Sequence, residues 1–327
     1  MLKTIRIGLG VAALGLATLF AASTAPVAAQ DWPQRPVRFI LPFGPGSAAD
    51  TLARVLGEDL AVRWGKPVVV ENRPGADGLL AINAVVSAKD DHTLLVSSTG
   101  SFLAHPYMHK KLDYDIDKDL TPIGRIADTL LIVAVPSDLP VSNLKEFVAL
   151  AKTKPELNLA ASAGVTEFAV DAFLKGENLK TVRVPYKNLG DAARDLAEGR
   201  IHFILTSYAV VRPLVETGKV KIIAAGTRNR TPLVKDVQSI TEAGYPVLAA
   251  DTSTALFGGP GLSADLRKKI AADMQAAMKE PKVRDRVVLT GQEIAPSNPE
   301  ELTQILKGQF QKADAIAQTL GMKKAGQ

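Results

Sequence analysis

The chain has 327 residues, of which 22% are charged and 46% hydrophobic, a composition typical of a globular protein and not of a disordered one. A chain of this length usually divides into two lobes, because single hydrophobic cores stop growing near this size. The formal net charge is +5, but no Lys/Arg run with interleaved aromatic residues occurs, so nucleic acid is not an expected partner. Cysteine is absent, which excludes disulfides, thiol nucleophiles and cysteine metal sites.

The first residues have the pattern of a secretory signal peptide. Lys3 and Arg6 form a short basic region, an apolar stretch follows at 7–22, and a run of small residues ends at Ala29. We therefore predict that residues 1–29 are a signal peptide cleaved after Ala29. The alternative is a retained membrane anchor, although no cysteine follows the apolar stretch and a lipoprotein anchor is excluded.

Strands and helices alternate over the first part of the mature chain. A strand is predicted at 37–41, and a Pro/Gly-rich turn leads from it to a helix. The apolar residues of this helix recur at helical spacing on one face: Leu52, Val55, Leu56, Leu60 and Trp64. Ser47, with Asp50 three residues later, resembles a capping box at the helix start. The next predicted strand, helix and strand lie at 68–71, 79–88 and 93–97, an alternation typical of parallel strands with crossover helices.

The same alternation restarts after residue 130. Strands are predicted at 130–135, 157–161, 181–184, 201–205 and 220–224. Helices are predicted between them at 143–152, 167–175, 191–198 and 210–217. The last third is mostly helical, with apolar stripes at Leu266, Ile270, Met274 and Met278 and at Leu302, Ile305, Leu306, Ile316 and Leu320. We expect the chain to cross from one lobe to the other near residues 123–131 and to return near residues 247–257. One predicted lobe therefore consists of residues 30–125 plus 252–327, and the second consists of residues 126–251.

Four connections have a composition that suits anion binding. Those at 42–47, 162–166 and 185–191 join a strand to a helix start through small residues, and 97–101 carries four hydroxyls. A helix start exposes unpaired N–H groups and the positive end of the helix dipole, and glycine lets the backbone approach a ligand closely. In open α/β sheets such loops line the crevice where ligands bind. Taken singly, such a turn is most often an ordinary connection and cap, so the prediction rests on the recurrence of these loops in both lobes.

Short motifs recur along the whole mature chain in a fixed order. The first is WPQRPVRFILPFGPGSAAD at 32–50. Further motifs lie at 69–76, 90–95, 184–187, 198–201, 218–221 and 242–246. Together they resemble the Bug family, the periplasmic solute receptors of tripartite tricarboxylate transporters. The resemblance implies an α/β, two-lobed periplasmic binding protein of the Venus-flytrap, type 2-like class, with two crossing strands between the lobes.

The resemblance also implies how a ligand is held. In the family, two loops grip one carboxylate of the ligand through backbone N–H groups and hydroxyls. The corresponding positions here are Phe43, Gly44, Gly46 and Ser47, then Ser162, Gly164 and Thr166. Thr99, Ser101 and Tyr208 are expected to add contacts. The expected ligand is a small carboxylate, with a dicarboxylate, an amino acid and an aromatic acid left open.

The family also implies a cellular setting. The expected partners are the membrane permease subunits of a tripartite tricarboxylate transporter, and the receptor is expected to be a periplasmic monomer without a cofactor or metal. Three departures from the family pattern concern the site: Gly44-Pro45-Gly46-Ser47 replaces Pro-Ala-Gly-Gly, Phe168-Ala169 replaces His-Leu, and His202 replaces an Asp. These departures put the family's preference for the far end of the ligand in doubt.

Other chemistries find little support. His105 and His109 have the spacing of a metal pair on a helix, but Pro106 between them argues against a regular helix. The alternating acids between Asp113 and Asp119 lack the Gly and distal Glu of a calcium loop. A catalytic role would need a titratable pair in the crevice, and none has recognisable spacing, so no catalytic residue is predicted. A ligand-dependent partner of a periplasmic sensor domain remains the alternative to a transport receptor.

Overall fold

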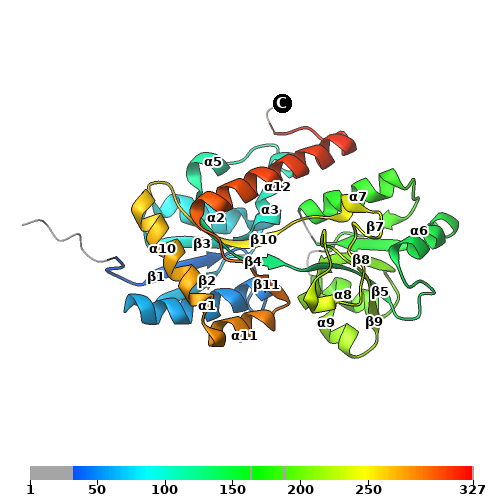
Figure 1. Ribbon diagram of the computed structural model, residues 1–327. Coiled ribbons are helices and arrows are strands. Elements are labelled where there is room, and N and C mark those ends of the chain that lie inside the picture. Colours follow the sequence, from blue (N-terminus) through cyan, green and yellow to red (C-terminus); the bar gives the residue numbers. More distant parts are fainter. Residues whose placement is uncertain (1–31, 163, 187–188, 326–327) are drawn as a thin grey trace, which may run out of the picture. The chain divides into compact units, whose positions relative to one another are not determined.

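The structure is a computed structural model that describes residues 32–162, 164–186 and 189–325. The predicted signal peptide at 1–29 lies outside the described residues, as do Ala163, Lys187 and Asn188 of the predicted loops. Residues Arg35–Gln327 form one compact unit, and Met1–Gln34 form another, of which only 32–34 are described. The account below concerns the larger unit (Figure 1).

The first of two sheets has six strands in the order β11-β4-β10-β3-β1-β2. Their bounds are β1 Val37–Leu41, β2 Val68–Asn72, β3 Thr93–Ser98, β4 Thr121–Thr129, β10 Ser253–Gly258 and β11 Gln292–Ile294. β1 pairs in parallel with both β2 and β3, whereas β10 runs antiparallel to β3 and β4. Parallel β1 and β3 therefore end at the same edge of the sheet.

The second sheet has five strands in the order β7-β6-β8-β5-β9. Their bounds are β5 Leu131–Pro136, β6 Asn158–Ala161, β7 Val182–Arg183, β8 Phe203–Ser207 and β9 Val220–Ala225. β6 is parallel to β7 and β8, and β5 is antiparallel to β8 and β9. Only Leu130 separates β4 from β5, so the chain passes there into the second sheet, and it returns to the first at β10. The predicted α/β fold with two sheets is confirmed.

Nine of the described helices have at least eight residues. They are α1 Ala48–Trp64, α2 Leu79–Ala88, α6 Leu144–Thr153, α7 Val165–Gly176, α8 Leu189–Ala197, α9 Tyr208–Glu216, α10 Ala264–Ala277, α11 Pro281–Val288 and α12 Pro299–Leu320. On α1 the predicted apolar face is buried, with Leu52, Leu56 and Leu60 fully inaccessible to solvent. Within the described part of the chain, no helix has the length and apolar character needed to span a bilayer.

One hydrophobic cluster joins elements of both sheets. Phe102 and Phe257 meet edge to face beside the first sheet, and Phe173 stacks on Phe203 beside the second. Helix α12 contributes Leu302 and other apolar residues to this cluster and packs against α7 (Figure 1). The burial of this shared apolar surface stabilises Arg35–Gln327 as a single unit.

Several predicted boundaries were wrong. Helix α7 begins at Val165 and not at 167, so Thr166 lies in its first turn, because Gly164 adopts a positive φ of 91° that ends the loop earlier. The predicted loop at 97–101 is instead the end of β3 and the start of a short helix, α3 (Thr99–Leu103).

Pro106 lies in a single helical turn and not in a regular helix that spans both histidines. His105–Met108 forms this turn, α4, and His109 after it is extended. Pro106 fits the first turn because it has no intrahelical N–H bond to lose there. Two further elements, α11 and β11, escaped prediction. Only Val283 and Val287 of α11 are buried, too few apolar positions for a recognisable stripe.

Candidate functional site

Parallel strand pairing places the predicted site residues in two groups, one at each sheet. Ile40 of β1 lies opposite Leu95 of β3, so the loop after β1 and the start of α3 leave the first sheet at one edge. In the second sheet Ala161 of β6 lies opposite Leu205 of β8, so Ser162 and the start of α9 leave it together. The hydroxyls of Ser162 and Thr206, 2.8 Å apart, confirm that these two chain segments adjoin.

The two groups touch where α3 and α7 begin. A Cβ atom added at Gly164 would lie 2.6 Å from the carbonyl oxygen of Gly100. One added at Gly100 would lie 2.5 Å from Cγ2 of Thr252 and 3.2 Å from Cγ2 of Val165. Only glycine therefore fits at these two positions, and the backbones of the two helix starts are in direct contact. The sequence indicated Gly164, but Gly100 and Thr252 were missed because no local motif marks a contact between distant segments.

The loop between β1 and α1 satisfies several of its own polar groups. The Ser47 hydroxyl accepts the Asp50 N–H at 3.2 Å, as the predicted capping box requires. The reciprocal bond differs from the prediction, because the Asp50 carboxylate accepts the N–H of Gly46 at 2.9 Å and not that of Ser47. The Ser47 N–H donates to the carbonyl of Gly44 at 3.3 Å. Two of the amides expected to face a ligand thus have partners within the loop.

Asp50 is a buried charge beneath this loop, with only 3% of its surface exposed. Its carboxylate accepts hydrogen bonds from Arg54 at 2.9 and 3.1 Å and from Asn72 Nδ2 at 2.8 Å. Burial works against the charged form, but the bonds from Arg54, Asn72 and the Gly46 amide outweigh it and lower the pKa of Asp50. Asn72 Nδ2 also donates to the carbonyl of Phe43 at 2.9 Å. The sequence marked Asp50 as a cap and placed Asn72 in the motif at 69–76, but it did not predict that the two side chains meet.

The connection between β6 and α7 is built differently. The Ser162 N–H donates to the carbonyl of Leu205 at 3.0 Å, and the hydroxyl of Thr166 donates to the carbonyl of Ser162. Thr166 is buried in the first turn of α7, with 3% of its surface exposed. The first turn of α7 therefore begins beside the contact with α3. The carboxylate site predicted at this helix start stays a prediction.

A compact ion cluster accompanies the start of α7. Arg183 of β7 donates to Glu167 and to Asp171, both at 2.7 Å. Burial raises the pKa of Glu167, against the opposing effect of the Arg183 charge. Because Arg183 is committed to these two acids, it offsets their negative charge beside the positive end of the α7 dipole.

The other three predicted residues have different surroundings. Thr99 is completely buried, and its hydroxyl accepts the N–H of Ser253 at 3.1 Å, so it links α3 to β10. Ser101 is half-buried in the same helix. Tyr208 is half-buried, its N–H donates to the carbonyl of Leu130 at 2.8 Å, and its ring lies against Gly291. As placed, Thr99 acts through the packing of α3 and has no exposed surface for a ligand.

Phe168 and His105 are both buried and contact other side chains inside the protein. Phe168, in place of the family His, is buried and meets Tyr107 of α4 edge to face. His105 is fully buried between the carbonyl of Asp77 at 2.9 Å and the hydroxyl of Tyr114 at 2.8 Å. A carbonyl can only accept, so Nε2 carries the proton, Nδ1 accepts from Tyr114, and burial lowers the pKa of His105. Among the described residues no three His, Asp or Glu side chains gather as metal ligands would.

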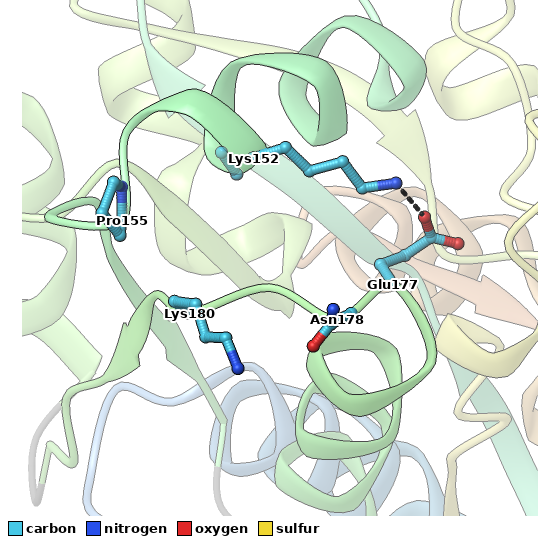
Figure 2. A pocket seen from close by; sticks show the side chains of 6 residues that line it. Lys152, Pro155, Glu177, Asn178 and Lys180 are labelled. Atoms are coloured by element: carbon cyan, nitrogen blue, oxygen red, sulfur yellow. Dashed lines mark hydrogen bonds and ion pairs between the residues drawn. The ribbon is translucent and has the colours of Figure 1, made fainter.

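Two cavities lie apart from the predicted residues. A cavity of 400 Å³ opens where α6 and α7 end (Figure 2). Its lining residues are Ala151, Lys152, Pro155, Glu177, Asn178 and Lys180. Lys152 Nζ and Glu177 Oε2 form an ion pair at 3.2 Å (Figure 2). Lys180 lies on the chain segment that follows α7. No predicted site residue lines this cavity or the smaller one of 260 Å³ near Tyr107 and Lys324.

The chain is similar to known proteins over most of its length. Residues 52–322 match the model of the tripartite tricarboxylate transporter family receptor. A UPF0065 protein of Bordetella bronchiseptica is 30% identical over 312 residues, which cover 94% of this chain and 92% of the relative. The solved structure of MatC from Rhodopseudomonas palustris with bound malate has a TM-score of 0.76 and 27% identity, over 87% of this chain and 99% of that one. The periplasmic binding protein BugD has a TM-score of 0.77 and 26% identity, over 90% and 100%.

Proposed function

Because the chain belongs to the tripartite tricarboxylate transporter receptor family, we propose that it binds a small dicarboxylate and delivers it to the permease subunits of such a transporter. The family's members are solute receptors, so this chain is a receptor and not an enzyme. Its place is the periplasm, where it is a monomer after cleavage of residues 1–29. The ligand lies between a lobe of residues 30–125 plus 252–327 and a lobe of residues 126–251.

The observation that carries this proposal is the contact between the starts of α3 and α7. Two strand–helix connections, one from each sheet, approach to backbone distance at Gly100 and Gly164. Helix starts of this kind bind carboxylates through N–H groups and the helix dipole. MatC, a neighbour of the same fold, holds malate, a four-carbon dicarboxylate. The ligand contacts we propose are Phe43, Gly44, Gly46, Ser47, Ser101, Ser162, Gly164, Thr166 and Tyr208, whereas Thr99 supports the site through the packing of α3.

The charges around the starts of α1 and α7 support recognition of the ligand by backbone N–H groups. Arg54 is bonded to Asp50, and Arg183 is bonded to Glu167 and Asp171. Both arginines are thus satisfied by acids of the chain itself. A ligand carboxylate would have to compete with these acids for the guanidinium groups, which favours recognition by backbone N–H groups instead.

A thermal-shift panel tests the proposal directly. The purified protein is heated with four- to six-carbon dicarboxylates, with glutamate and aspartate, and with benzoate as the aromatic acid. A ligand at a hundred times its Kd stabilises the folded state by about 2.7 kcal/mol, so a true ligand raises the Tm clearly. We expect the dicarboxylates to give the largest shift, with calorimetry supplying the Kd. A shift with benzoate alone would replace the proposed ligand class, and no shift with any acid would contradict the proposed binding.

Co-purification tests the proposed partner. The tagged receptor is recovered from cross-linked cells grown on the dicarboxylate that gives the largest thermal shift. We expect the permease subunits of a tripartite tricarboxylate transporter among the captured proteins. Capture of a sensor kinase without a permease would favour a role in signalling instead.

A further inference from the structure

Helix α1 carries two buried aspartates that form a matched pair. Asp50 and Asp59 are 3% and 5% exposed, and each pairs with the arginine four residues later. Their remaining partners differ. Asp59 meets Lys282, a side chain of α11, whereas Asp50 accepts the Gly46 backbone N–H. The two acids share their helix and their burial, but only Asp50 reaches a loop proposed to contact the ligand.

The loop before α1 is held at two points. The Gly46 N–H binds Asp50 at 2.9 Å, and the Phe43 carbonyl binds Asn72 Nδ2, also at 2.9 Å. The two anchors are themselves joined, because the same Nδ2 donates to Asp50 Oδ1 at 2.8 Å. An amide nitrogen carries two hydrogens, so Asn72 serves both acceptors at once. The network therefore ties the end of β2 to both ends of the loop at 43–46.

Helix capping alone does not account for this network. Ser47 already caps α1 through its hydroxyl, so the helix start has its usual partner without the Asp50 carboxylate. Burying a carboxylate is costly unless it is paired and hydrogen-bonded. Asp50 receives that compensation from Arg54 and Asn72, and its bond to Gly46 fixes a residue whose positive φ of 80° few side chains adopt.

We infer that Asp50 and Asn72 are positioning residues for ligand binding, which set the conformation of the loop at 43–47 before the ligand arrives. This inference rests on the proposed function for its consequence, because a fixed loop lowers the ordering cost of binding a carboxylate. The loop order itself is a property of the free protein and is measurable without a ligand.

The test compares Asp50→Ala and Asn72→Ala with Asp59→Ala as the matched control. Amide hydrogen exchange at 43–47 is followed by NMR in the free protein, and the Kd for malate is measured by calorimetry. We expect Asp50→Ala to speed exchange of the Gly46 amide about tenfold or more, because its acceptor is gone. Both site variants should weaken malate binding about tenfold. Asp59→Ala should lower the Tm but leave exchange at 43–47 and the Kd within about twofold of wild type.

Asp50→Asn separates positioning from general stability. Asparagine keeps an oxygen acceptor for Gly46 without the charge, so Gly46 exchange should return toward wild type even where the Tm stays low. If Asp50→Ala does not fold, Asn72→Ala decides the matter, since Asn72 is half-buried at a sheet edge. Exchange at 43–47 that stays at the wild-type rate in both site variants overturns the inference. If wild type binds neither malate nor any acid of the panel, the proposed function fails while the exchange result still stands.

Discussion

The two strand–helix connections at 42–47 and 162–166 look alike in sequence but are held by different forces. The first is a partly exposed loop, in which the Gly46 N–H donates to Asp50 and the Phe43 carbonyl accepts from Asn72. In the second, Gly164, Val165 and Thr166 are buried, and Gly164 is in backbone contact with Gly100. A glycine-rich turn before a helix therefore does not reveal whether side chains or packing determine its shape. The predictions below separate these two forces, from the largest expected effect to the smallest.

The contrast is sharpest at the glycines themselves. Gly164→Ala should lower the free energy of unfolding by about 2–4 kcal/mol, because φ is +91° and the new Cβ meets a backbone oxygen at 2.6 Å. Gly44→Ala is the matched control in the first loop, where nothing lies within 4 Å of the added atom. It should change stability by less than about 0.5 kcal/mol. Urea denaturation measures the free energy of unfolding of both variants. Equal losses of stability would show that the packing contact at Gly164 does not distinguish the two connections.

The acids Asp50 and Glu167, beside the two connections, should respond to pH in opposite directions. The lowered pKa of Asp50 contributes stability above pH ~4, which is lost as the pH falls through the folded-state pKa. The raised pKa of Glu167 acts the other way, with its contribution present at low pH and lost as the pH rises. The destabilisation caused by Asp50→Asn should therefore grow from pH 3 to pH 7, whereas Glu167→Gln should become relatively more stable.

Urea unfolding at several pH values measures both variants against wild type. One proton of difference between the folded and unfolded states changes the slope by at most about 1.4 kcal/mol per pH unit. His105→Gln is a useful third variant, because the lowered pKa of His105 predicts stability lost as the pH falls below ~6.5. Slopes of the same sign for Asp50→Asn and Glu167→Gln would contradict the distinction between the two connections.

The serine cap tests whether the first loop matters beyond its helix. Ser47→Ala should destabilise the protein by about 1 kcal/mol, because the Asp50 N–H loses its acceptor. Ser263→Ala removes an equivalent cap from α10, where the hydroxyl accepts the Leu266 N–H at 3.2 Å. Thermal unfolding should show similar losses in both. Calorimetry with a dicarboxylate should show weaker binding, by about 1–3 kcal/mol, for Ser47→Ala alone.

Thr166 gives the corresponding test in the second connection. Thr166→Ala should weaken dicarboxylate binding by about 1–3 kcal/mol, because the carbonyl of Ser162 loses its hydroxyl donor and the start of α7 loosens. Thr166→Ser keeps the hydroxyl and is the control, with an affinity close to wild type. An unchanged Kd in Thr166→Ala would remove this hydroxyl from the proposed site.

The smallest effect belongs to the cavity at the ends of α6 and α7. Lys152→Ala breaks a surface ion pair whose partners are 52% and 30% exposed, so it should cost less than about 1 kcal/mol. It should leave the Kd for any dicarboxylate unchanged. A clear loss of affinity would move the ligand away from the helix starts and into this cavity (Figure 2).

The sequence by itself determined the α/β alternation and most of the strands and long helices. It did so because apolar spacing, turn residues and caps act over a few residues, as the face of α1 and the Ser47 cap show. The ordered motifs also identified the family. Boundaries were less secure, as the early start of α7 and the helix α3 in place of the expected loop at 97–101 show.

Only the tertiary structure decided which groups meet at the candidate site. Asn72 lies far along the chain from the Phe43 carbonyl that it binds, and Gly100 lies farther still from Gly164. Thr99 was expected to contact the ligand, but the structure buries it against Ser253. Contacts of this kind depend on strand order and on how segments from two sheets pack, and no local pattern of residues encodes either.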